Sequence, residues 1–158
     1  MELKIRPARL TDVPRLLVLY RQLDIGAEPQ VSVEPARARF LDLSSNPHHR
    51  IFVAEAGDEV VGTFAMIFVP GISHGGRDSC VVEDVVVSAP RQGSGVGRQM
   101  MNFAMQVCAE RGCYKLVLSS HVDRDKAHRF YEGLGFERHG YSFLVTSRSL
   151  QEPARAAS

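Results

Sequence analysis

One strand–turn–helix segment constrains the fold of this chain more than any other part of the sequence. Residues 80–87 include five valines, which is typical of a strand buried on both faces. Residues 96–108 repeat apolar side chains at spacings of three and four, which predicts an amphipathic helix. Between the two lie Gly93, Gly95 and Gly97, three glycines within five residues. The chain therefore has to pass from a buried strand into a helix through a turn of unusual backbone freedom.

The rest of the sequence predicts further strands and helices around this segment. Apolar or alternating runs predict strands over residues 3–6, 51–56, 59–69, 115–118, 136–139 and 141–145. Helical spacing predicts helices over residues 13–23, 32–41 and 127–134. We expect an α/β (α+β) fold over residues 1–150, a single domain with a mixed central sheet of about six or seven strands flanked by about four helices. Residues 151–158 are expected to form a disordered tail.

Composition fits one folded domain and excludes several functions. The chain has 158 residues, within the range of a single core, and its formal net charge is only +1. That balance lacks the basic field used in non-specific nucleic-acid binding, so no nucleic-acid partner is expected. The longest strongly apolar run, residues 63–69, is too short to span a membrane, and the start shows no signal-peptide pattern. Three cysteines without such a signal predict reduced thiols and a cytoplasmic location.

The glycine segment favours an anion site. The first amides of a helix have no acceptor within it, and the helix dipole favours negative charge there. A tight strand-to-helix turn is the simpler alternative, but three glycines at alternate positions exceed what one turn needs. The dinucleotide fingerprint would need a glycine where Met100 stands, and a Walker A loop would need Lys-Ser or Lys-Thr after Gly97. Neither common nucleotide motif is therefore present.

Two motifs, separated by a helix and a strand, carry a family resemblance. Residues 92–97 fit the pattern Q/R-x-x-G-x-G/A, and residues 130–136 fit F-Y-x-x-x-G-F. Together they make residues 51–145 resemble the GNAT superfamily of acetyl-CoA-dependent N-acetyltransferases. Arg124 stands where many members of that family carry an asparagine that contacts the coenzyme.

The resemblance implies where acetyl-CoA, the cosubstrate, would bind. GNAT folds splay two central strands to open a slot for the pantetheine arm, which pairs with the edge of one strand, here Val85, Val86 and Val87. The pyrophosphate is expected on the amides of the glycine segment, made up of Gln92, Gly93, Ser94, Gly95, Val96, Gly97 and Arg98. Members of the family often form homodimers, so self-association is a further expectation.

Acetyl transfer to an amine needs a deprotonated nitrogen and a proton for the leaving thiolate. The resemblance implies that Tyr131 is the acid. The pKa of a phenol, about 10, is close to the pKa of an alkyl thiol. The alternative is that Tyr131 is only an aromatic residue of the core. Glu83 interrupts a run of valines, where a buried carboxylate is costly without a function or partner. Since side chains alternate along a strand, Glu83 is expected to share a face with Val85 and Val87. We therefore expect Glu83 to be the base; Asp84, expected on the opposite face, and a water molecule are the alternatives.

Two other patterns are weaker. Residues 71–75 match the G-x-S-x-G of α/β-hydrolases, but that motif needs a helix after it, and another strand is predicted to follow instead. Cys108 and Cys113 have no second pair, and no H-E-x-x-H motif occurs, so no metal is expected.

Local similarity bears on the acceptor. Residues 127–131 and 141–143 look like aminoalkylphosphonate N-acetyltransferases, whereas residues 83–87 and 111–115 look like glucosamine-phosphate N-acetyltransferases. Both acceptors combine a primary amine with a phosphorus oxyanion, which arginines recognise well. We expect acetyl transfer to the primary amine of a small molecule, by direct attack in a ternary complex. A catalytically silent acyl-CoA-binding domain and a peptide or protein N-acetyltransferase are the alternatives.

Overall fold

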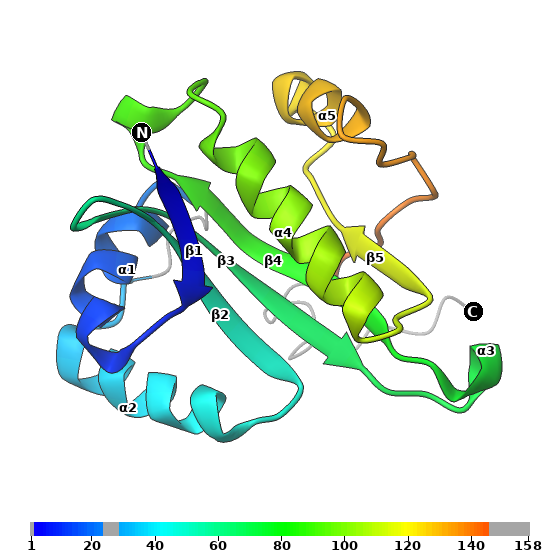
Figure 1. Cartoon of the computed structure of the whole chain (residues 1–158), viewed down its shortest axis with the longest axis horizontal. Helices are drawn as coiled ribbons and strands as arrows, with labels where there is room; N and C mark the ends of the chain where they lie inside the picture. The colour runs from blue at the N-terminus through cyan, green and yellow to red at the C-terminus, as the bar shows by residue number, and fades with distance from the viewer. Residues whose placement is uncertain (1, 24–28, 146–158) are drawn as a thin grey trace, which may run out of the picture. The chain divides into compact units, whose positions relative to one another are not determined.

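A mixed sheet organises the first of the two compact units into which the chain divides, Met1–Leu118 and Ser119–Ser158. In this computed structural model, which describes residues 2–23 and 29–145, the sheet has five strands in the order β1-β2-β3-β4-β5 (Figure 1). They are β1 (Leu3–Pro7), β2 (His49–Ala56), β3 (Glu59–Val69), β4 (Ser79–Val87) and β5 (Lys115–Leu118). The first four pair antiparallel, and β5 pairs parallel with β4, so the fold is the expected α+β type.

Helices of the first unit cover both faces of this sheet. The helices are α1 (Val13–Tyr20), α2 (Val33–Ser45), α3 (Ser73–Gly76), α4 (Val96–Glu110) and, in the second unit, α5 (Asp125–Glu132). Val53 of β2 packs with Leu16 of α1 in a core cluster that α2 also joins. Its neighbour Phe52 meets Phe103 of α4, with ring centroids 5.2 Å apart. Because adjacent strand residues point to opposite faces, α1 and α2 cover one face and α4 covers the other. In the described part of the chain, no helix has the length and apolar content needed to cross a membrane.

The structure confirms the strands and helices for which the sequence carries clear local signals. β3 and β5 occupy the predicted ranges, and Gly57, with a φ of 61°, forms the turn between β2 and β3. α4 ends at Glu110, just before Gly112, whose φ is 74°. The short α3 lies in the loop between β3 and β4, where no element was predicted.

The two strands expected over residues 136–139 and 141–145 are not formed. Within the described residues the sheet therefore has five strands rather than six or seven. Tyr141 and Phe143 are 90% and 95% exposed, so this segment does not bury the side chains that a half-buried strand would bury. Alternation shows which side a strand would bury, but a strand forms only when another backbone satisfies its N–H and C=O groups. The tail expected over residues 151–158 lies outside the described residues.

A buried ion-pair network fixes the start of the chain to the sheet. The guanidinium of Arg6 donates hydrogen bonds to both carboxylate oxygens of Asp12, at 2.8 and 3.1 Å, and it also pairs with Glu55. The Asp12 carboxylate accepts a further hydrogen bond from the backbone N–H of Arg9, at 2.7 Å. Burial would raise the pKa of Asp12, but these hydrogen bonds lower it below its ordinary value.

Candidate active site

β4 extends beyond its partner β5. The parallel ladder joins Ser79 to Lys115 and ends where Val82 meets Leu118. Residues 83–87 of β4 continue along β3, but on the β5 side they have no ladder partner among the described residues (Figure 1). An unpaired strand edge presents N–H and C=O groups that can hydrogen-bond an extended ligand. Val85 and Val87 therefore lie on a stretch of β4 whose backbone groups β5 does not pair.

The glycine segment leads from this edge into α4. Gly93 and Gly95 have φ values of 77° and 89°, in the left-handed region, and Gly95 is the N-cap of α4. A Cβ atom on either glycine would meet no other atom within 4 Å. Glycine is therefore required here by backbone conformation rather than by crowding, and the space beside the loop is open. With the unpaired first amides of α4, this geometry suits an anion such as a pyrophosphate.

Side-chain hydrogen bonds hold the glycine segment against β4. The Gln92 amide donates to the carbonyl of Val87 at 3.2 Å, and the Ser94 hydroxyl donates to the carbonyl of Arg91 at 2.6 Å. Val96 buries its side chain, whereas Arg98 on the next part of α4 is exposed. The hydrogen bond from Gln92 thus ties the loop to the end of β4, while the side chain of Arg98 stays exposed to solvent.

A bulge in β4 changes the direction of the two acidic residues. Ala65 of β3 pairs with Glu83 of β4, and Thr63 of β3 pairs with Val86 of β4. The two pairs are therefore two residues apart on β3 but three residues apart on β4. β4 therefore has one extra residue over this stretch, and Asp84 within it has a φ of 52°. Asp is one of the few residues other than glycine that tolerate this conformation.

The bulge corrects the expected facing of Glu83. Regular alternation would put Glu83 on the face of Val85 and Val87, but the register puts it on the face of Val86. That face is the one covered by α1 and α2, because Val86 belongs to their core cluster. Asp84 faces the same side, since its charge acts on Tyr20 of α1 and on His49.

The two carboxylates share one environment. Burial and the negative charge of Asp84 raise the pKa of Glu83, and burial raises the pKa of Asp84 against the opposing effect of His49. Burial and the charge of Asp84 also raise the pKa of Tyr20 to about 12, with the Thr63 hydroxyl opposing. Both residues are nevertheless exposed to solvent, which weakens these effects, so each acid is only a somewhat better proton acceptor than a carboxylate at its ordinary pKa.

His49 lies near these carboxylates, since the charge of Asp84 acts on its pKa. Its Nδ1 atom is buried, and no described residue offers it a hydrogen bond. Burial lowers the pKa of His49, so the imidazole is neutral near pH 7. Sequence reasoning missed both Tyr20, which fits the apolar stripe of α1, and His49, which resembles a polar loop residue. Their proximity to Asp84 depends on how α1 and β2 pack, which no local pattern reveals.

Tyr131 lies on α5 in the second unit. Its ring makes edge contacts with Phe130 and Phe136, with centroids 5.1 and 5.8 Å apart. Gly135, with a φ of 96°, turns the chain so that the N–H of Phe136 donates to the carbonyl of Tyr131 at 3.1 Å. This geometry explains why the F-Y-x-x-x-G-F motif ends in Gly-Phe. Burial raises the pKa of Tyr131 and the positive charge of Arg124 opposes it, so the phenol keeps its proton at neutral pH.

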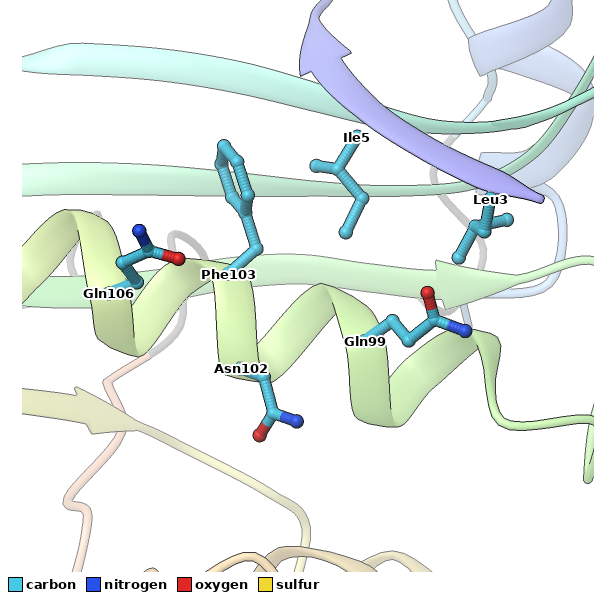
Figure 2. A pocket seen from close by; sticks show the side chains of 6 residues that line it. All are labelled: Leu3, Ile5, Gln99, Asn102, Phe103 and Gln106. Carbon is cyan, nitrogen blue, oxygen red and sulfur yellow. The ribbon is translucent and has the colours of Figure 1, made fainter.

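A hollow of about 300 Å³ lies on the α4 face of the sheet (Figure 2). Its lining comes from β1 and α4 and consists of Leu3, Ile5, Gln99, Asn102, Phe103 and Gln106. None of these side chains ionises, so the hollow cannot supply a base or an acid. Among the described residues, no group of three or more His, Cys, Asp or Glu side chains could hold a metal ion.

Comparison with known proteins identifies the class. The acetyltransferase (GNAT) family matches residues 16–136. The glucosamine 6-phosphate N-acetyltransferase of Trypanosoma brucei brucei is 29% identical over 139 residues, which are 88% of this chain and 92% of that protein. A putative acetyltransferase from Agrobacterium tumefaciens str. C58 superimposes with a TM-score of 0.85 and 30% identity, covering 91% of this chain and 99% of that one. For glucosamine-6-phosphate N-acetyltransferase from Arabidopsis thaliana, the TM-score is 0.81 and the identity 25%, with 93% and 99% covered.

The fold and these matches define an N-acetyltransferase. The chain belongs to the GNAT family, which takes its acetyl group from acetyl-CoA. The resemblance that the two sequence motifs carry is confirmed.

Proposed function

We propose that this enzyme acetylates the primary amine of a small phosphorylated molecule, with glucosamine 6-phosphate as the leading candidate. The pair of carboxylates at Glu83 and Asp84 supports this most directly, because it places negative charge for an ammonium group beside the unpaired edge of β4. The relatives from T. brucei brucei and A. thaliana, both named as glucosamine 6-phosphate N-acetyltransferases, support the choice of acceptor.

The donor would be held by backbone groups. The amides of residues 93–98 would bind the pyrophosphate of acetyl-CoA, since Gly93 and Gly95 leave the loop open and turned for close approach. The edge of β4 from Val85 to Val87 would bind the pantetheine arm as an added strand, because β5 does not pair with it there. Acetyl-CoA supplies the activated acyl group, and the chain supplies position and proton transfer.

The proton transfers follow from the two raised pKa values. Glu83 takes a proton from the bound ammonium group, so that a neutral amine attacks in a ternary complex; its raised pKa brings it closer to the working pH. Asp84 holds its negative charge against the same ammonium group. Tyr131, still protonated at neutral pH, gives its proton to the departing thiolate.

Thiol release from acetyl-CoA with a matched panel of amines tests this function. The panel contains glucosamine 6-phosphate, glucosamine, an aminoalkylphosphonate and a peptide with a free N-terminus. We expect the highest kcat/KM with glucosamine 6-phosphate, and a higher KM once its phosphate is removed. Turnover of the peptide alone, or of no amine despite donor binding, would contradict the proposal.

A further inference from the structure

All three cysteines of the chain gather at the C-terminal end of α4. Cys80 lies on β4, Cys108 in the last turn of α4 and Cys113 just before β5. The thiols of Cys80 and Cys113 lie close enough to the Cys108 thiol to raise its pKa, in addition to the effect of burial. The Cys108 thiol also donates to the carbonyl of Lys115 at 3.7 Å. The acetyl transfer described above uses none of these sulfur atoms.

The backbone that ends α4 brings Cys108 and Cys113 together. The N–H of Gly112 donates to the carbonyl of Ala109, and the N–H of Cys113 donates to that of Cys108, both at 3.0 Å. With Gly112 at a φ of 74°, these bonds form a Schellman motif, whose first and last residues bring their side chains into contact. A disulfide needs Cα atoms about 4.4–6.8 Å apart, and the Schellman motif holds its first and last residues close together.

The three thiols differ in access to solvent. Cys80 and Cys108 are buried, whereas Cys113 is partly exposed. Burial raises the pKa of Cys80 to about 11, and burial together with the neighbouring thiols also raises the pKa of Cys108. An oxidant in solution therefore meets Cys113 first, and the sulfur of Cys108 lies next to it.

We propose that Cys113 and Cys108 are an oxidisable pair that a hydroperoxide converts to a disulfide. The Cys113 sulfur attacks one peroxide oxygen, the O–O bond breaks, and a sulfenic acid and one water form when hydrogen peroxide is the oxidant. The Cys108 sulfur then attacks the Cys113 sulfur, the S–OH bond breaks, and the oxygen leaves as a second water with the Cys108 proton. Two thiols and one hydrogen peroxide thus give one disulfide and two waters.

The disulfide would lock the C-terminal cap of α4. It would join the two sulfur atoms by a covalent link across the short loop that Gly112 turns. Closing such a loop restricts the unfolded chain more than the folded one, so the oxidised protein should melt several degrees higher. A dithiol reductant should reverse the change.

Peptide mapping of the full chain after hydrogen peroxide treatment tests this inference. We expect wild type to lose two free thiols, to gain a peptide linking Cys108 to Cys113, and to recover both thiols with dithiothreitol. Cys113→Ser should form no disulfide, whereas Cys80→Ala, the matched control, should still form it. Three outcomes would each overturn the proposal: a disulfide between Cys80 and Cys108, a disulfide between two chains, or no disulfide at all. If a variant fails to fold, peptide mapping of the wild type alone distinguishes these outcomes. The readout is independent of acetyl transfer.

Discussion

Glu83 and Asp84 are consecutive residues of β4, yet both carboxylates lie on the face of the sheet that α1 and α2 cover. In a regular strand the sheet itself would separate the two charges. The bulge instead places them in one environment, where the charge of Asp84 raises the pKa of Glu83. The position of one extra residue therefore tunes the proposed base.

Replacing Asp84 should shift the pH dependence of catalysis. The reaction needs Glu83 ionised, so kcat/KM falls as the pH drops through its pKa. Asp84→Asn removes the negative charge that raises this pKa, and the acidic limb should move to lower pH. Glu83→Gln should abolish that limb and lower kcat by about 10²–10⁴-fold. Asp58→Asn, in the exposed β2–β3 turn, is the control. If Asp84→Asn did not shift the acidic limb, Glu83 and Asp84 would not share one electrostatic environment.

Replacing Tyr131 should separate chemistry from donor binding. Tyr131→Phe keeps the ring contacts with Phe130 and Phe136 but removes the proton donor. We expect kcat to fall by about 10²-fold while the Kd for coenzyme A, measured by calorimetry, stays within error. Tyr141→Phe, at an exposed position, should leave both values unchanged. An unaltered kcat in Tyr131→Phe would remove its proposed role.

A matched pair of glycine variants tests the donor site. Gly95→Ala and Gly57→Ala both put a Cβ on a left-handed residue with no other atom within 4 Å, so both should cost about 1–2 kcal/mol of folding stability. Only Gly95→Ala places that Cβ where the pyrophosphate would lie. We expect its Kd for coenzyme A to rise about tenfold, which is about 1.4 kcal/mol, with no change for Gly57→Ala. Equal affinities in the two variants would refute the assignment.

The ion pair between Arg6 and Asp12 should contribute more to the free energy of unfolding than an exposed ion pair does. Their side chains are 11% and 10% exposed, so Arg6→Met leaves a buried carboxylate without its partner and should cost about 3–5 kcal/mol in urea unfolding. The exposed pair of Arg37 and Glu34 is the control, and Arg37→Met should cost less than about 1 kcal/mol. Similar losses in the two variants would show that burial does not matter here.

The same ion pair predicts that the folding stability of the protein falls at acidic pH. The pKa of Asp12 is lowered in the folded protein, so its contribution is present above its unfolded pKa of about 4. That contribution is lost as the pH falls below 4 through the lower folded value. Asp12→Asn should be less stable at pH 7 and should lose less stability than wild type between pH 5 and pH 2. Parallel pH profiles for the two proteins would contradict this.

The sequence predicts those parts of this molecule that depend on neighbours in the chain. Valine-rich β4, the glycine turn and the amphipathic α4 are local patterns, and all three are present as predicted. The bulge at Asp84 is not predictable in this way, because an extra residue becomes visible only in the register with β3. Tyr20 and His49 come to Asp84 from distant elements, so their role also depends on tertiary packing. The predicted strands over residues 136–145 fail for a related reason, since no described strand pairs with them.

The free edge of β4 also has a consequence for solubility. Beyond Val82, its backbone groups face a side where the described structure offers no strand, and such an edge attracts strands of other molecules as readily as a ligand. A bound donor that covers this edge would shield it from self-association. With the donor bound as proposed, the enzyme saturated with coenzyme A should therefore aggregate later on heating or concentration than the empty enzyme.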